Sequence, residues 1–327
     1  MTSFYGGYRL QPDHFEVPTL PREMTDFMQS GMGLPVGSPG KVGVLELDFA
    51  QRGEQGRTEL VHHYQKAPLK IVRPHYYDPA QPGMPYLYTV DMGGGVVQGD
   101  RLRTDLNFGP GTRAHVTSQS HTKVYEMDNN YATAQVNLTV GEGAYVEYVP
   151  DPIILFKGSR YYQRVRAEVD PSATLVMDET IYAGRISRGE LHDYDVYASD
   201  LELSAPGPTL FACDRARLVP SVRPVDGLGV FGGRAVVHTM YVVTPQVKAT
   251  ELADLLHESA AWVVNYYEDE SCQFAASTLP GVNPTGSAGA WLRLVTNDTV
   301  VSLAAARVLL EEVHQLLLGT ELPPAQK

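Results

Sequence analysis

Alternation of apolar and polar residues dominates the middle of the chain. A period of two indicates half-buried β-strands with one wet face, and we interpret such strands as antiparallel. The segments 132–140 and 161–169 show the pattern over nine residues each, with these positions on the apolar side: Ala132, Ala134, Val136, Leu138, Val140, Tyr161, Val165, Ala167 and Val169.

A weak internal repeat accompanies these strands. Turn signals at 109–111, 141–143 and 170–172 are each followed by an alanine and then by a strand pattern. Their spacing of roughly 30 residues is enough for two or three strands per unit and suggests stacked β layers that wind as a superhelix. Unrelated hairpins of similar length would produce the same spacing.

The last third of the chain changes to a helical period. Helices are predicted over 250–267, with Thr250 as N-cap, and over 299–318, between an Asn297 or Asp298 cap and a terminating Gly319. A strand is expected between them at 291–295. The predicted fold is therefore mainly β, a superhelix-like stack of antiparallel β layers with two C-terminal α-helices.

Residues 1–40 show no sustained period. They are rich in Gly, Pro and Met, and we predict a flexible leader there, followed by a single β domain over 41–327.

Composition excludes several classes of protein. A net charge of −12 and a pI near 5.3 argue against nucleic acid or an anionic membrane as the main partner. Two cysteines give no disulfide framework, and neither has a zinc-like spacing. With no signal peptide and no apolar run long enough for a membrane span, a soluble cytoplasmic protein is predicted.

Glycines and prolines mark corners between the strands. The glycines at 93–99 allow a phosphate-loop interpretation, but no Lys-Ser/Thr follows them and the next segment has a strand pattern. A tight corner that needs positive φ is the favoured interpretation. Pro150-Asp151-Pro152 is a rigid extended break, in which Asp151 is either a turn residue or a functional one.

Acidic residues concentrate between 178 and 202, where seven carboxylates and two arginines give a local charge of −5. In strand register Glu179 points inward, and a buried carboxylate must be paired, protonated or close to a cation. Structural pairs, Glu179–Arg185 or Glu190–Arg188, are the alternative. The order of residues contains no nucleophile elbow, Ser/His/Asp order or His-Glu-x-x-His, so no enzyme chemistry is visible.

Seven corner and strand motifs, in this order, resemble the UreD (UreH) family of urease accessory proteins. They cover roughly 41–320, although the leader is longer than the family suggests and Leu155 stands where a proline is common. The motifs are APLKIVRP at 67–74, GGVVQGDRL at 94–102, TSQSHTKVY at 117–125, EYVPDP at 147–152, GSRYYQ at 158–163, GRISRGE at 184–190, and Arg293-Leu294 before the last helix.

The resemblance implies a non-catalytic scaffold for urease maturation. Members of this family are all-β superhelices with a C-terminal helix pair. They bind apo-urease, UreF and the GTPase UreG, assemble as a dimer of such units, and deliver nickel through a water-filled interior passage. Nickel would be transient cargo, and no tightly bound cofactor is expected.

Spaced acids without a Cys/His cage suit a transfer path, because carboxylates and water hold Ni²⁺ weakly enough to release it. We predict that such acids line a nickel path: Asp100, Glu147, Glu179 and Glu190. The structural corners are predicted at Gly94, Gly95, Gly99, Pro150, Asp151, Pro152, Gly184, Arg185 and Gly189. Partner binding, with UreF over the helical region, is predicted at Trp262, Tyr266, Leu309 and Val313.

Two other classes compete with this prediction. A carbohydrate-active β-solenoid enzyme would need a carboxylate pair in one open groove lined with exposed aromatics. A plain protein-binding β module would leave the acids merely solvated.

Overall fold

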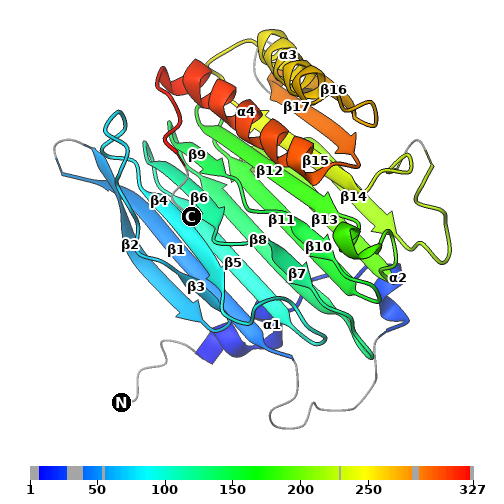
Figure 1. The fold of residues 1–327 in the computed structure, drawn as a ribbon. Coiled ribbons are helices and arrows are strands. Elements are labelled where there is room, and N and C mark those ends of the chain that lie inside the picture. The colour runs from blue at the N-terminus through cyan, green and yellow to red at the C-terminus, as the bar shows by residue number, and fades with distance from the viewer. Residues whose placement is uncertain (1–6, 28–39, 54–55, 228–229, 282–286, 325–327) are drawn as a thin grey trace, which may run out of the picture.

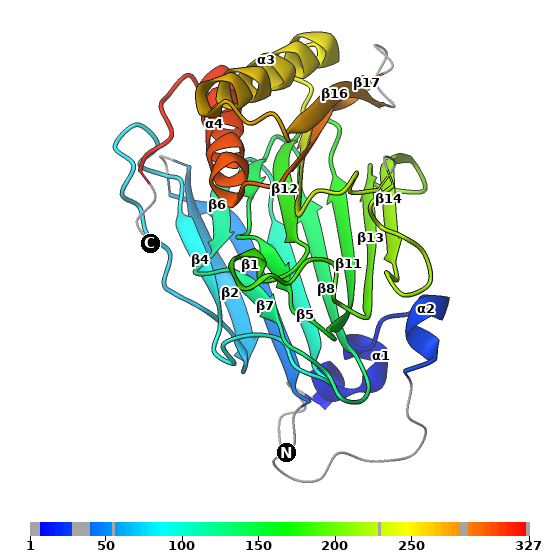
Figure 2. The same cartoon turned by 45° about the vertical axis from the view of Figure 1, so that its right-hand side comes forward.

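A computed structural model describes residues 7–27, 40–53, 56–227, 230–281 and 287–324. Two facing sheets form the body, and two helices lie at one end of it (Figures 1 and 2). Sheet A has the order β14-β13-β11-β8-β5-β1-β2. Its strands are β1 (Val42–Arg52), β2 (Arg57–Lys66), β5 (Arg101–Phe108), β8 (Ala132–Val140), β11 (Arg160–Val169), β13 (Val196–Ser204) and β14 (Leu210–Leu218).

Sheet B has the order β16-β17-β15-β12-β9-β6-β4-β3, with β10 and β7 continuing beside β12. Its strands are β3 (Leu69–Ile71), β4 (Tyr86–Asp91), β6 (Arg113–Ser118), β7 (Thr122–Val124), β9 (Tyr145–Tyr148), β10 (Ile153–Leu155), β12 (Thr174–Tyr182), β15 (Val236–Val243), β16 (Gln273–Pro280) and β17 (Ser287–Thr296).

Successive coils of the chain stack as the repeat predicts. Each coil crosses from sheet A to sheet B and returns, so β5 pairs with β8 and β6 with β9. Corner backbones join the layers: Gly111 N–H donates to Glu142 O at 2.7 Å, and Gly143 N–H to Ser172 Oγ at 2.9 Å. The mainly β, superhelix-like fold is confirmed.

The strand direction within the stack corrects one prediction. The central ladders from β1 through β5, β8 and β11 to β13 are parallel, not antiparallel. Neighbouring strands lie one full coil apart and therefore run the same way, whereas alternation along a strand carries no information on direction. Antiparallel pairs occur at the ends, as in β1–β2 and β13–β14.

Two apolar layers hold the body together. One lies between the sheets and includes the inward residues of β8 and β11 predicted from alternation, such as Leu138 and Val165. The other packs sheet B against α3 (Ala249–Tyr267) and α4 (Thr299–Leu318). Both helices match their predicted ranges and stand over one end of sheet B (Figure 2).

Helix capping is correct for α4 and wrong for α3. Asp298 Oδ1 accepts from Val300 N–H at 2.7 Å, and Gly319 ends the helix with a φ of 69°. In α3 the N-cap is Lys248, without a side-chain cap, instead of Thr250. Lys248 pairs with Glu251 at 3.2 Å, a contact that the cap preference of threonine does not anticipate.

Part of the predicted leader packs on sheet A. Residues 7–27 contain η1 (Gly7–Leu10), α1 (Pro12–Phe15) and α2 (Arg22–Thr25), which lie on the far side of the body from α3 and α4 (Figure 2). Gln135 on β8 donates to Phe15 O and Glu16 O at 3.0 Å each. The predicted wet face of β8 is therefore covered at Thr133 and Gln135, which are both buried.

Among the residues that the structure describes, none of the helices has the length and apolar character that a membrane span requires.

Candidate functional site

Sheet B is interrupted where two successive coils break their strands. β9 ends at Tyr148 and β10 begins at Ile153, because Pro150 and Pro152 cannot donate to a ladder. In the preceding coil β6 ends at Ser118 and β7 begins at Thr122. Two bonds join the broken segments: Asp151 N–H donates to Ser118 Oγ at 2.8 Å, and Thr122 N–H to Pro152 O at 3.0 Å. We call residues 118–121, 150–152 and 178–180 the window.

Two cavities meet at the window. The interior cavity, about 160 Å³, lies between the sheets, and the outer cavity, also about 160 Å³, lies between sheet B and α4. Both are lined by Pro150, Asp151, Asp178 and Thr180. These shared residues form the wall between the sandwich interior and the helical side of the molecule, at the break in sheet B.

Carboxylates line the interior cavity: Asp91, Asp151, Asp178 and Glu179. Neighbouring residues of a strand point to opposite faces, so Glu179 of β12 lies toward sheet A and Asp178 toward α4. Glu179 accepts a hydrogen bond from Gln163 Nε2, and His121 lies on the same lining. The cavity thus offers oxygen ligands on both sides of the break.

Burial raises the pKa of two of the cavity carboxyls, Glu179 and Asp91. Desolvation, and then the charge of Asp214, raises the pKa of Glu179 to about 7, against the opposing effect of Arg293. Desolvation also raises the pKa of Asp91. A carboxyl with a pKa of about 7, such as Glu179, can exchange its proton for a cation near neutral pH, and a perturbed carboxyl in a cavity is a candidate functional group.

Of the four predicted path residues, Glu179 alone lies among the described residues that line these cavities. Asp100 is buried at a corner, where it accepts Lys41 N–H at 2.8 Å and Val97 N–H at 3.0 Å. Those bonds satisfy both of its oxygens, so the geometry assigns Asp100 to the turn.

Glu147 fastens α4 to sheet B. Its carboxylate is fully buried, with His115 Nδ1 at 2.6 Å, His314 Nδ1 of α4 at 2.7 Å and the Tyr145 hydroxyl at 2.7 Å. Desolvation would raise the pKa of Glu147, but the two imidazoles outweigh it and lower that pKa to about 2. The strong partners leave this carboxylate little freedom to bind cargo.

Glu190 pairs with Arg185 across the corner 184–190, and Arg185 also lies over the Phe156 ring. Both structural pairs considered from sequence, Glu179–Arg185 and Glu190–Arg188, are therefore wrong. The 3-10 turn Ile186–Arg188 brings Glu190 back to Arg185, whereas Glu179 lies inside the sandwich.

The glycines at the predicted corners have the positive φ angles that tight corners require. Gly94, Gly95, Gly99, Gly184 and Gly189 all have positive φ. A Cβ on Gly95 would lie 2.5 Å from the Tyr125 ring, and one on Gly184 would lie 2.5 Å from Glu190 O. No lysine or helix follows the 93–99 glycines, so the corner interpretation holds and the phosphate loop does not.

The predicted partner residues divide into two groups. Trp262 and Tyr266 are 57% and 69% exposed on α3 and stack with ring centroids 5.4 Å apart. Leu309 and Val313 are fully buried in the layer between α4 and sheet B, which corrects their assignment to a contact surface. The broad apolar face of α4 packs within the core of this chain itself.

Sequence reasoning did not select Asp91 or Asp178 as path residues, and it offered His121 only as one of three histidines that could join carboxylates in space. Asp178 was counted among the acids, but nothing in a single strand shows that a ladder breaks beside it. The available signal was the pairing of breaks: the segment 119–121 and the prolines around Asp151 stand roughly 30 residues apart, which is one repeat.

Comparison with known proteins decides the family. The UreD urease accessory protein family matches residues 41–326. A protein named urease accessory protein UreD 2 from Streptomyces griseus is 45% identical over 296 residues, which cover 90% of this chain and 96% of that protein. The chain belongs to the UreD family.

More distant relatives agree. A urease accessory protein UreD 2 from Brucella suis is 33% identical over 92% of this chain and 96% of its own length. A urease accessory protein UreD from Cenarchaeum symbiosum is 32% identical over 81% of this chain and 89% of its own length. The family resemblance inferred from the corner motifs is thereby confirmed.

Proposed function

We propose that this chain is a urease maturation factor that works as a scaffold without catalysis of its own. It binds apo-urease and, together with UreF and the GTPase UreG, passes nickel to the urease active site through the window in sheet B. The observation that carries the proposal is the meeting of two cavities at Asp151, Asp178 and Thr180 in a member of this family. Nickel is cargo here, not a resident cofactor.

The side chains of the interior cavity suit the transfer of nickel better than its storage. The acidic side chains that line the interior cavity are Asp91, Asp151, Asp178 and Glu179. Among the described residues of that lining, His121 is the one histidine. Oxygen ligands hold Ni²⁺ less firmly than imidazole or thiolate, and a conductive path needs binding that attracts an ion without trapping it. This set replaces the sequence-based path through Asp100, Glu147 and Glu190.

The exposed aromatic residues of α3 provide the partner surface in this proposal. Trp262, Tyr266 and Tyr267 are exposed together on one helix. Aromatic residues exposed in this way are enriched at protein interfaces. We assign this surface to UreF, and the complete assembly to a dimer of such three-protein units in the cytoplasm.

The location of the carboxylates favours this function over a carbohydrate-active enzyme. A glycosidase needs its carboxylate pair in a groove that admits a sugar chain. Here Glu179 lies between two sheets, in a cavity of about 160 Å³ that is also lined by the partly buried Tyr148 and the buried Tyr161. That volume accommodates water and an ion but not a polysaccharide.

A co-expression assay tests the proposal. Urease, UreF and UreG are produced with the Asp178→Asn/Glu179→Gln variant, and urease activity is measured against added nickel. We expect activation to fall at least tenfold while the variant still co-purifies with UreF and UreG. Glu168→Gln, an exposed carboxylate of β11, is the matched control. Full activation by the double variant would contradict the proposed path.

A further inference from the structure

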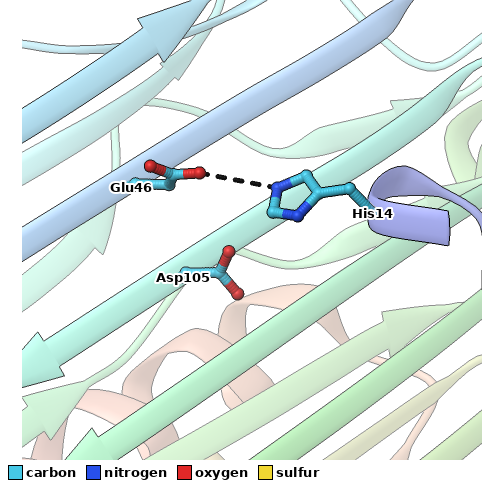
Figure 3. A group of neighbouring side chains, drawn as sticks. All are labelled: His14, Glu46 and Asp105. Atoms are coloured by element: carbon cyan, nitrogen blue, oxygen red, sulfur yellow. Dashed lines mark ion pairs between the residues drawn. The ribbon is translucent and has the colours of Figure 1, made fainter. Parts of the chain in front are cut away.

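A second group of metal-ligand side chains lies on the outer face of sheet A, away from the window. Glu46 of β1 and Asp105 of β5 are direct partners in a parallel ladder, so their side chains stand next to each other. His14 of α1 lies over this pair (Figure 3). One ligand atom from each residue can be chosen so that all three lie within 4.8 Å of one another.

Two atoms of this group face each other without hydrogen bonds. His14 Nε2 and Glu46 Oε1 are buried, lack a hydrogen-bond partner among the described residues, and stand 3.5 Å apart. That separation is too long for a hydrogen bond. It matches two ligands of one ion, because bonds of about 2.1 Å at a tetrahedral angle place their ligand atoms about 3.4 Å apart.

Other groups already orient the two carboxylates. Arg9 contacts the second oxygen of Glu46 at 2.6 Å. Arg103 Nε and Asn137 Nδ2 each donate to Asp105 at 2.7 Å. Such secondary partners fix the ligands of metal sites. The arginines also balance the two negative charges, so an ion here would bind more weakly than in a site of unpaired acids.

His14 is suited to be a ligand. Its Nε2 lies 3.5 Å from Glu46 Oε1 and has no hydrogen-bond partner among the described residues. A neutral imidazole keeps a lone pair for a metal, whereas a protonated one would repel it. The residue's backbone is also held, because Arg103 donates to His14 O at 2.6 Å.

We propose that His14, Glu46 and Asp105 bind one divalent first-row transition-metal ion, which fastens the leader to sheet A. One imidazole and two carboxylates are a nitrogen and oxygen ligand set that suits such ions, and water would complete the coordination. The site is separate from the nickel path: none of its three residues lines either cavity at the window. His14 also precedes residues 41–326, the part matched by the family.

Titration of the full, tag-free chain with Co²⁺ tests the site, followed by visible absorption and calorimetry. We expect one equivalent with the absorption of a nitrogen and oxygen site. His14→Ala and Glu46→Gln should each weaken that equivalent at least tenfold, with unchanged circular dichroism. His257→Ala, an exposed histidine of α3, should bind as the natural chain does. Glu179→Gln should also leave this equivalent intact, which separates it from the path.

Hydrogen exchange measures the fastening directly. Added Co²⁺ should slow exchange of the backbone amides in 7–16 in the natural chain and not in His14→Ala. The proposal is overturned if the folded natural chain binds no Co²⁺ or if His14→Ala binds Co²⁺ with the same affinity. It is also overturned if Co²⁺ does not change amide exchange in 7–16.

Discussion

At the scale of single residues, the groups around a carboxylate separate those that hold the fold together from those available to cargo. Glu147 is fully buried and Glu179 is half-buried on the cavity wall, yet the more deeply buried Glu147 has the lower pKa, about 2 against about 7. Two imidazoles surround Glu147, whereas Glu179 has an amide donor and the opposed charges of Asp214 and Arg293. The difference follows from partners, not from depth.

Glu179 should lower stability near neutral pH. Its pKa in the folded chain lies above the ordinary 4.5, so its stabilising contribution is complete below pH 4.5 and is lost as pH rises through about 7. Glu179→Gln should therefore increase the free energy of unfolding by about 1–3 kcal/mol at pH 8 and leave it unchanged at pH 4.5. Urea unfolding at both pH values checks this, with Glu168→Gln as the control. If Glu179→Gln and the natural chain had the same free energy of unfolding at pH 8, the ionised Glu179 carboxylate would not destabilise the fold.

Gly95 is a second prediction at this scale. Its φ is +147° and a Cβ would meet Tyr125 and Lys123 O, whereas neighbouring Gly94, at φ +71°, has open space around it. Gly95→Ala should cost about 2–4 kcal/mol, and Gly94→Ala about 1 kcal/mol from backbone strain alone. Denaturant midpoints of the two variants test this, and equal losses would contradict the role given to close packing.

At the scale of elements, α4 depends on a polar contact with sheet B as well as on its apolar face. Glu147→Ala leaves two buried histidines without their carboxylate and should cost about 3–5 kcal/mol at pH 7. Because its pKa is lowered, the contribution of Glu147 is present above pH 4.5 and lost as pH falls through about 2. The thermal midpoint should drop by roughly 6–10 °C.

Hydrogen exchange localises that loss. It should increase most in α4 of the Glu147→Ala variant, and the exposed Glu168→Ala substitution should change neither exchange nor the midpoint. A variant in which α4 keeps its protection would show that the apolar layer alone holds the helix.

The elements also show what a sequence can and cannot predict. Strands, helices and corners were predictable, because local period, caps and positive-φ glycines act within a few residues. The parallel direction of β8 and β11 was not, since it depends on which coil lies alongside. Asp178 and the His14 cluster were missed for the same reason. Their neighbours come from strands or a leader distant in sequence, and Leu309 and Val313 were misassigned because an apolar helix face does not reveal what covers it.

At the scale of the whole molecule, the stack of coils explains how a path can cross a sheet. Breaks at one level in successive repeats place Ser118–His121 beside Pro150–Pro152, and β12 supplies Asp178 next to them. A continuous ladder there would close the sandwich. The window and the interior cavity are thus consequences of one repeat in which prolines stop the pairing of strands.

The central claim is that nickel passes this window on its way to urease. The most direct measurement is the nickel content of urease matured with Asp151→Phe, which fills the junction of the cavities, compared with Asp151→Asn, which removes the charge alone. We expect nickel per active site near the level without this chain for Asp151→Phe and an intermediate level for Asp151→Asn, with UreF and UreG still bound. Fully loaded urease from the Asp151→Phe complex would contradict it.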